Sequence, residues 1–152
     1  MKIKMMLASL ALVFSQVALA ENWVYVDTFE GEKMYLDHDR VKQISFDSYE
    51  LKQGLKQGLS KDNSYRSVWF KTAFDDEPNS TADTKNYHIE NSFYDCERKR
   101  YELNTVETFE NHQSTFKTQP ITTPSSSDAW EKVIPNTLGD TMFKVACRAK
   151  VK

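Results

Sequence analysis

The chain has 152 residues, enough for one domain, and 39% of them are hydrophobic. Four Gly and four Pro are too few for a low-complexity or fibrous protein. The formal net charge of −2 lacks the basic excess that is typical of nucleic-acid-binding proteins, which argues against nucleic acid as a partner.

The first twenty residues have the pattern of an export signal. Lys2 and Lys4 give a positive start, an apolar run of ten residues follows, and small residues stand at Ala18 and Ala20. The apolar run is too short to cross a bilayer, which needs about 20 residues. No Cys follows it, so the signal lacks the acceptor for a lipid anchor. We expect residues 1–20 to be a signal peptide that is removed after Ala20.

The remaining residues, 21–152, are expected to form one exported domain with 18 basic and 22 acidic residues. It contains two cysteines, Cys96 and Cys147. In an oxidising compartment a lone pair most often forms a disulfide. Zinc binding and thiol redox catalysis are the alternatives, but neither Cys has a Cys or His at ligand spacing, and redox pairs commonly lie two residues apart. We expect one disulfide, which would stabilise the fold by roughly 4 kcal/mol.

The first half of the domain contains three strand-like segments. Trp23–Asp27 and Lys33–Asp37 alternate on either side of Gly31, which predicts a hairpin. Tyr65–Phe74 is rich in aromatic and β-branched residues and is a further strand. Between them, residues 44–63 carry Leu at helical spacing but also two Gly, so a weak helix and an irregular hairpin tip both remain open.

The second half begins with two extended stretches. Residues 87–104 and 106–117 are dense in Tyr, Phe, Val and Thr, and we expect them to pair as two antiparallel strands. Residues 75–86 and 119–127 carry Pro, Ser, Asn and Asp and are expected to be loops.

The last element, at the C-terminal end of the chain, fits either a strand or a helix. Residues 143–151 alternate as a strand would, whereas Leu138, Met142 and Val145 share a helical face. On the helical interpretation, Asp140, Lys144 and Arg148 lie together on the opposite face, and Thr137 is an N-cap. The pattern alone does not decide between the two.

The order of several short motifs resembles the surface-adhesin protein E family of Gram-negative bacteria. The resemblance covers nearly all of the domain. The motifs that carry it are Trp23; Met34-Tyr35-Leu36-Asp37 with Val41; Val68-Trp69; Asp95-Cys96 followed by Arg98 to Tyr101; Trp130; Ile134-Pro135-Asn136-Thr137; and Val145-Ala146-Cys147.

This resemblance implies an α+β fold, in which a single antiparallel β-sheet packs against a C-terminal helix and one disulfide, Cys96 to Cys147, ties the two. It decides the last element in favour of a helix over about Thr137–Ala149. It also implies that the protein is an adhesin for host proteins.

Catalytic and metal-binding patterns are missing from the sequence. There is no Gly-rich phosphate loop, nucleophile elbow or metalloprotease motif among its 152 residues. His38 stands between two Asp and is a conceivable metal ligand, but a capped polar turn explains the same residues. We therefore expect no enzyme activity, no cofactor and no metal.

The densest basic cluster, Arg98, Lys99 and Arg100, is our candidate binding site. Such a cluster can bind sulfated glycans or an acidic protein patch, although a solvated strand face is the plainer interpretation. We expect a non-enzymatic protein of the periplasm or cell surface that adheres to host matrix or serum proteins. The alternative is a periplasmic inhibitor or envelope-maintenance protein with a bacterial partner.

Overall fold

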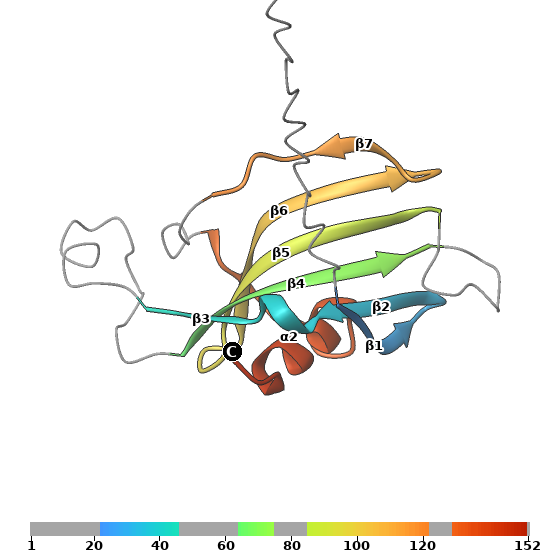
Figure 1. Cartoon of the computed structure of the whole chain (residues 1–152). Helices are drawn as coiled ribbons and strands as arrows, with labels where there is room; N and C mark the ends of the chain where they lie inside the picture. Colours follow the sequence, from blue (N-terminus) through green and yellow to red (C-terminus); the bar gives the residue numbers. More distant parts are fainter. Residues whose placement is uncertain (1–21, 46–63, 75–84, 122–128, 152) are drawn as a thin grey trace, which may run out of the picture.

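Alternating aromatic and β-branched residues form the strands of one antiparallel sheet, and one helix packs on a face of that sheet (Figure 1). The computed structural model describes residues 22–45, 64–74, 85–121 and 129–151. The predicted signal peptide, the ambiguous segment after residue 45 and most of the two predicted loops lie outside the described residues.

The strand order in the sheet is β1-β2-β4-β5-β6-β7, while β3 pairs with β4 and β8 pairs with β6. Short β3 and β8 therefore widen the sheet at one end. The elements are β1 (Trp23–Phe29), β2 (Glu32–Asp37), the 3-10 helix η1 (His38–Arg40), β3 (Lys42–Ile44), β4 (Tyr65–Ala73), β5 (Tyr87–Asp95), β6 (Arg100–Glu110), β7 (Gln113–Lys117), β8 (Glu131–Lys132) and α2 (Leu138–Arg148).

The expected pair of strands over residues 87–104 and 106–117 is wrong in its number and its boundaries. The same residues form three strands, because the chain turns after Asp95 and again after Glu110. The turns contain no Gly; instead Lys99, Asn111 and His112 adopt positive φ angles of 52°, 49° and 62°. Non-Gly residues take this conformation infrequently, so the turns carry little sequence signal.

The predicted C-terminal helix is confirmed, and its end groups are satisfied by side chains. Thr137 is the N-cap and accepts a hydrogen bond from the Asp140 backbone N–H at 3.3 Å. The Asp140 carboxylate in turn accepts from the backbone N–H of Asn136, the residue before the N-cap, at 3.0 Å. At the other end, Arg66 of β4 donates to the carbonyls of Ala146 and Ala149, where a cation also favours the helix dipole.

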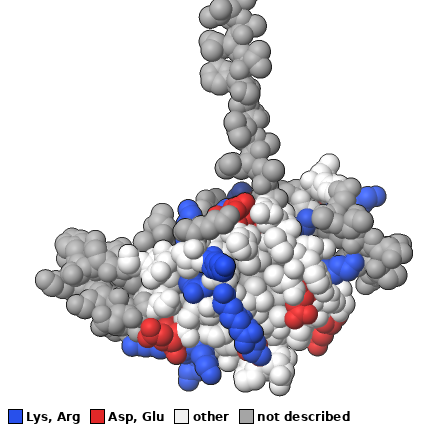
Figure 2. Space-filling model, turned by 60° about the horizontal axis from the view of Figure 1, so that its bottom comes forward, with Lys and Arg blue, Asp and Glu red and all other residues white. Residues whose placement is uncertain are grey.

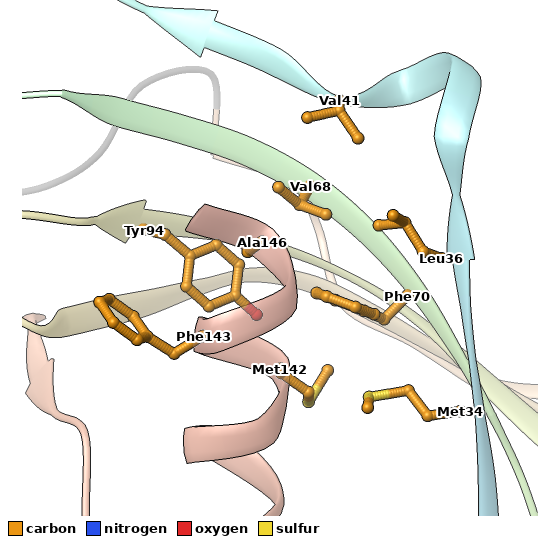
Figure 3. Packing of buried hydrophobic residues seen from close by; sticks show 9 residues of the cluster. All are labelled: Met34, Leu36, Val41, Val68, Phe70, Tyr94, Met142, Phe143 and Ala146. Carbon is orange, nitrogen blue, oxygen red and sulfur yellow. The ribbon is translucent and has the colours of Figure 1, made fainter. Parts of the chain in front are cut away.

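The main core lies between α2 and the sheet. Alternate residues of β4, Val68, Phe70 and Thr72, are fully buried, as their period of two predicted. Met142 of α2 faces Met34 of β2 (Figure 3), and the Phe143 ring lies 6.3 Å from that of Tyr94. The helix therefore contributes apolar burial to strands that are far apart in the sequence. The cluster consists of Met34, Leu36, Val41, Val68, Phe70, Tyr94, Met142, Phe143 and Ala146.

A smaller cluster lies on the opposite face of the sheet, at the end where β3 and β8 join. Phe93 follows the same alternation as its neighbour Tyr94 but points to the other side, where it packs with Tyr65 and Trp130. Ile44 of β3 closes this cluster at its edge. Both faces of the sheet are thus enclosed around the end of β5.

A β-bulge changes the direction of side chains along the edge strand β1. Tyr25 pairs with Tyr35, but Asp27 pairs with Met34, so Val26 is the extra residue. Met34 belongs to the core under α2, and its partner Asp27 is therefore placed on the helix side of the sheet. Without the bulge, the alternation of the strand would put Asp27 on the face of Tyr25.

Candidate functional site

The three basic residues predicted as a binding site lie at the turn between β5 and β6, not along a strand face. Arg98 and Lys99 are exposed, and Lys99 holds a positive φ of 52°. Arg100 is the first residue of β6 and is half-buried. We call Arg98, Lys99 and Arg100 the turn cluster.

Asp95 fixes the backbone of this turn. One of its carboxylate oxygens accepts from the Arg98 backbone N–H at 3.1 Å, and the other accepts from Arg100 Nε at 2.9 Å. The Asp95 side chain is fully buried and that of Arg100 is 13% exposed, so water does not screen this ion pair as it would at the surface. The guanidinium of Arg100 also lies 5.0 Å from the centre of the Trp130 ring.

Two further connections hold the turn beside α2. The predicted disulfide is confirmed: Cys96, the first residue after β5, is bonded to Cys147 of α2. On the other side, the Val133 backbone N–H donates to the Lys99 carbonyl at 3.0 Å. The turn is thus attached to the sheet, to the helix and to the segment that follows β8.

The three residues of the turn cluster therefore have different places. Arg98 and Lys99 are exposed at the surface, whereas the guanidinium of Arg100 faces Asp95 and Trp130. Sequence reasoning grouped the three by proximity and did not identify Asp95 or Trp130 as their supports. An acid just before a Cys and a run of cations was the available signal for Asp95; the contact with Trp130 depends on the tertiary fold alone.

The exposed side of α2 adds further cations to this part of the surface. Lys144 and Arg148, one helical turn apart, are exposed, as the helical pattern predicted. Lys144 Nζ lies 2.7 Å from the Asp140 carboxylate, and this contact lowers the pKa of Asp140 below its usual value. Figure 2, seen from the helix side, shows Lys and Arg side chains across the middle of this face, with most Asp and Glu nearer its edges.

A half-buried titratable pair, which the sequence did not reveal, lies in the first half of β5. His88 Nε2 and Glu90 Oε2 are 3.6 Å apart, a distance that would favour an ion pair. Desolvation by burial disfavours both charges: it lowers the pKa of His88 and raises that of Glu90 to about 7. Ser92 donates a hydrogen bond of 3.3 Å to Glu90 and opposes part of this rise.

The structure places His38 in a capped turn. It opens η1, where Asp37 is the N-cap and accepts hydrogen bonds from the Asp39 backbone and from Arg40. Among the described residues, no group of three or more His, Cys, Asp or Glu side chains is arranged to hold a metal ion.

Comparison with known proteins identifies one family. Residues 23–148 match the family model described as surface-adhesin protein E. No curated protein and no solved structure matches the chain. The match covers every strand among the described residues and the whole of α2.

Proposed function

Because the chain belongs to the surface-adhesin protein E family, we propose that it is an exported, non-enzymatic binding protein that adheres to host matrix or serum proteins. The family and the disulfide indicate an exported protein. In the part of the chain that the structure describes, no helix is long and apolar enough to cross a membrane. The proposal includes removal of residues 1–20 and a working domain over residues 21–152.

The proposed contact site rests on one observation, which is that the turn cluster is attached to the elements around it. Asp95 and the disulfide hold the turn from both sides, so Arg98 and Lys99 are presented on a backbone that is ordered before any partner binds. A preorganised surface loses less conformational entropy on binding. Arg98 and Lys99 supply the exposed charge, and Arg100 positions the turn through Asp95.

Charges at the rim of an interface mainly accelerate association and contribute little to final affinity. We therefore expect the double variant Arg98→Ala/Lys99→Ala to bind immobilised host matrix and serum proteins with an association rate lowered several-fold. The difference should shrink at 1 M salt, where the Debye length is about 3 Å. Arg100 is left intact, because its removal would disturb the turn itself.

A control variant separates this effect from a general loss of positive charge. Lys42→Ala/Lys150→Ala removes two exposed cations outside the turn and should leave the association rate unchanged. If both double variants slow association equally, the turn cluster is not the contact site. Binding that is unaffected in either variant would retain the adhesin function and reject the site.

Location decides between the adhesin and a protein with a bacterial partner. An adhesin has to reach the outer face of the cell, whereas a periplasmic inhibitor or envelope-maintenance protein does not. Protease treatment of intact cells should therefore degrade the protein while a periplasmic marker survives. Complete protection of the protein would contradict the adhesin function and support the periplasmic alternative.

A further inference from the structure

A groove between β1 and α2 is lined by no residue of the turn cluster and carries opposite charges on its two walls. Its volume is about 470 Å³. Val145 and Ala149 provide its apolar surface, and the residues around them are polar or charged. The lining consists of Asp27, Thr141, Lys144, Val145, Arg148 and Ala149.

The two walls of the groove carry opposite charges that do not meet. Lys144 and Arg148 stand on the α2 wall and Asp27 stands on the β1 wall. Among the described residues, no hydrogen bond or ion pair joins Asp27 to either cation: Lys144 pairs with Asp140, and Arg148 has no ion-pair partner within this set. Within the part of the chain that the structure describes, the Asp27 carboxylate bonds only locally, where one oxygen accepts from the Thr28 backbone N–H at 2.8 Å.

The presence of Asp27 in the groove results from the β-bulge. The extra residue Val26 turns Asp27 to the helix side, away from the face that it would otherwise share with Tyr25. Bulges commonly re-aim one side chain in this way next to a site. The carboxylate is therefore held opposite Arg148 by the backbone of β1, while Lys144 and Arg148 are held by successive turns of α2.

We propose that this groove binds an anionic saccharide unit. A guanidinium and an ammonium bind a sulfate or carboxylate group, and Arg148 can do so with two parallel hydrogen bonds. Asp27 and the Thr141 hydroxyl accept hydrogen bonds from sugar hydroxyls, and Val145 and Ala149 face the carbon side of the ring.

The charges around the groove favour this class of ligand over two others. A bare inorganic anion gains nothing from Asp27, which repels it. A zwitterion would use both walls equally, but the lining carries two cations, Lys144 and Arg148, and one acid, Asp27, so its excess charge is positive. A ligand with one anionic group and several hydroxyls matches both walls and the excess charge.

The probes for the test are a sulfated heparin disaccharide, glucuronic acid, inorganic sulfate and sucrose, each added to the exported protein and followed by amide chemical shifts. We expect the sulfated disaccharide or glucuronic acid to shift the signals of Thr141, Val145 and Ala149, and the tighter of the two identifies the anionic group. Sucrose should have no effect. If neither anionic sugar shifts these signals, the proposal is wrong.

Substitutions on the two walls test the arrangement. Arg148→Gln should weaken binding of the anionic sugar about tenfold, the effect of losing a charge-assisted hydrogen bond, while Lys42→Gln should not change it. Asp27→Ala should weaken binding of the sugar but strengthen binding of inorganic sulfate. Sugar affinity that is unchanged in Arg148→Gln, or increased in Asp27→Ala, would overturn the proposal.

The outcome is independent of the proposed host-protein contact. Arg98→Ala/Lys99→Ala leaves every groove residue in place and should keep the sugar affinity of the original chain. Equal loss in that variant and in Arg148→Gln would show a diffuse attraction for anions and would overturn a specific groove site.

Discussion

The two ends of β5 differ in how completely the protein encloses them. The last five residues, Asn91–Asp95, are buried and lead into the turn of Cys96–Lys99, which we call the closed end. The first four residues, Tyr87–Glu90, are only half-buried and lie beside the exposed turn at Asn111 and His112, which we call the open end. The strand is continuous, so this difference comes from its neighbours.

Backbone conformation does not account for the contrast, since both turns use non-Gly residues at positive φ. At the closed end a buried carboxylate, a disulfide and a backbone hydrogen bond attach the turn to three other elements. At the open end, the N–H groups of Asn111 and His112 donate to Asn86 Oδ1 and the Lys85 carbonyl. Order at a turn therefore depends on residues outside it. We expect local unfolding of the open end to cost less free energy than local unfolding of the closed end.

Removal of Asp95 should affect the closed end most. Asp95→Ala leaves the nearly buried guanidinium of Arg100 without its carboxylate and the Arg98 N–H without its acceptor. Breaking such a pair costs about 3–5 kcal/mol of unfolding free energy. Urea denaturation measures the loss. Glu110→Ala, an exposed acid at the open end, is the control and should change stability by less than about 0.5 kcal/mol. A loss below about 1 kcal/mol for Asp95→Ala would contradict this account.

Loss of the disulfide should make the closed end unfold locally almost as easily as the open end. Cys96 and Cys147 are 51 residues apart, so their double substitution by Ser should lower the unfolding free energy by up to about 4 kcal/mol. Amide hydrogen exchange of residues 97–99 should accelerate toward that of residues 111–112. The original protein in reductant provides the matched comparison. An unchanged denaturation midpoint under reduction would refute the assigned role of the bridge.

The sequence contains most of what builds the sheet and little of what distinguishes its two ends. Alternation predicted the faces of β4, and a lone Cys pair predicted the bridge. Turns without Gly hid the division of residues 87–117 into three strands. The helix required the family resemblance, because its residues fit period 2 and period 3.6 equally well.

The sequence predicted single residues of the candidate sites but not the contacts that place them. The cations of the turn cluster were visible in the sequence, but the different place of Arg100 depends on Asp95 and Trp130. The groove could not be predicted from the sequence. Simple alternation places Asp27 on the same face as Tyr25, whereas the bulge at Val26 moves it to the helix side. Bulges and tertiary contacts leave no periodic trace in a single sequence.

Glu90 stands where the closed and open ends meet and should make stability depend on pH. Its pKa is about 7 in the folded protein and 4.5 in the unfolded chain, so the folded state holds a proton that the unfolded chain releases between these values. The contribution of Glu90 to stability is therefore present below pH 4.5 and is lost as the pH rises toward 7. The pKa of His88 is lowered in the folded protein. Its contribution to stability is therefore present above pH 6.5 and is lost as the pH falls below that value.

A comparison of Glu90→Gln with the original protein isolates the effect of Glu90. The amide resembles the protonated acid, so the variant should gain up to about 3 kcal/mol at pH 8 and nothing at pH 4. Urea denaturation at a series of pH values measures the difference. Glu110→Gln makes the same change at an exposed position and is the matched control. A constant difference for Glu90→Gln would show that Glu90 titrates normally.

The smallest expected effect concerns the open turn. Asn111 has a φ of 49°, a conformation that Asn tolerates better than other residues with a side chain. Asn111→Ala should therefore cost about 1 kcal/mol, while Asn111→Gly, which adopts this φ freely, should stay within about 0.5 kcal/mol of the original protein. Both variants keep the backbone N–H that donates to Asn86, so the pair isolates the cost of the φ angle. Equal losses in both would mean that a contact of the Asn111 side chain, rather than its backbone conformation, holds the open turn.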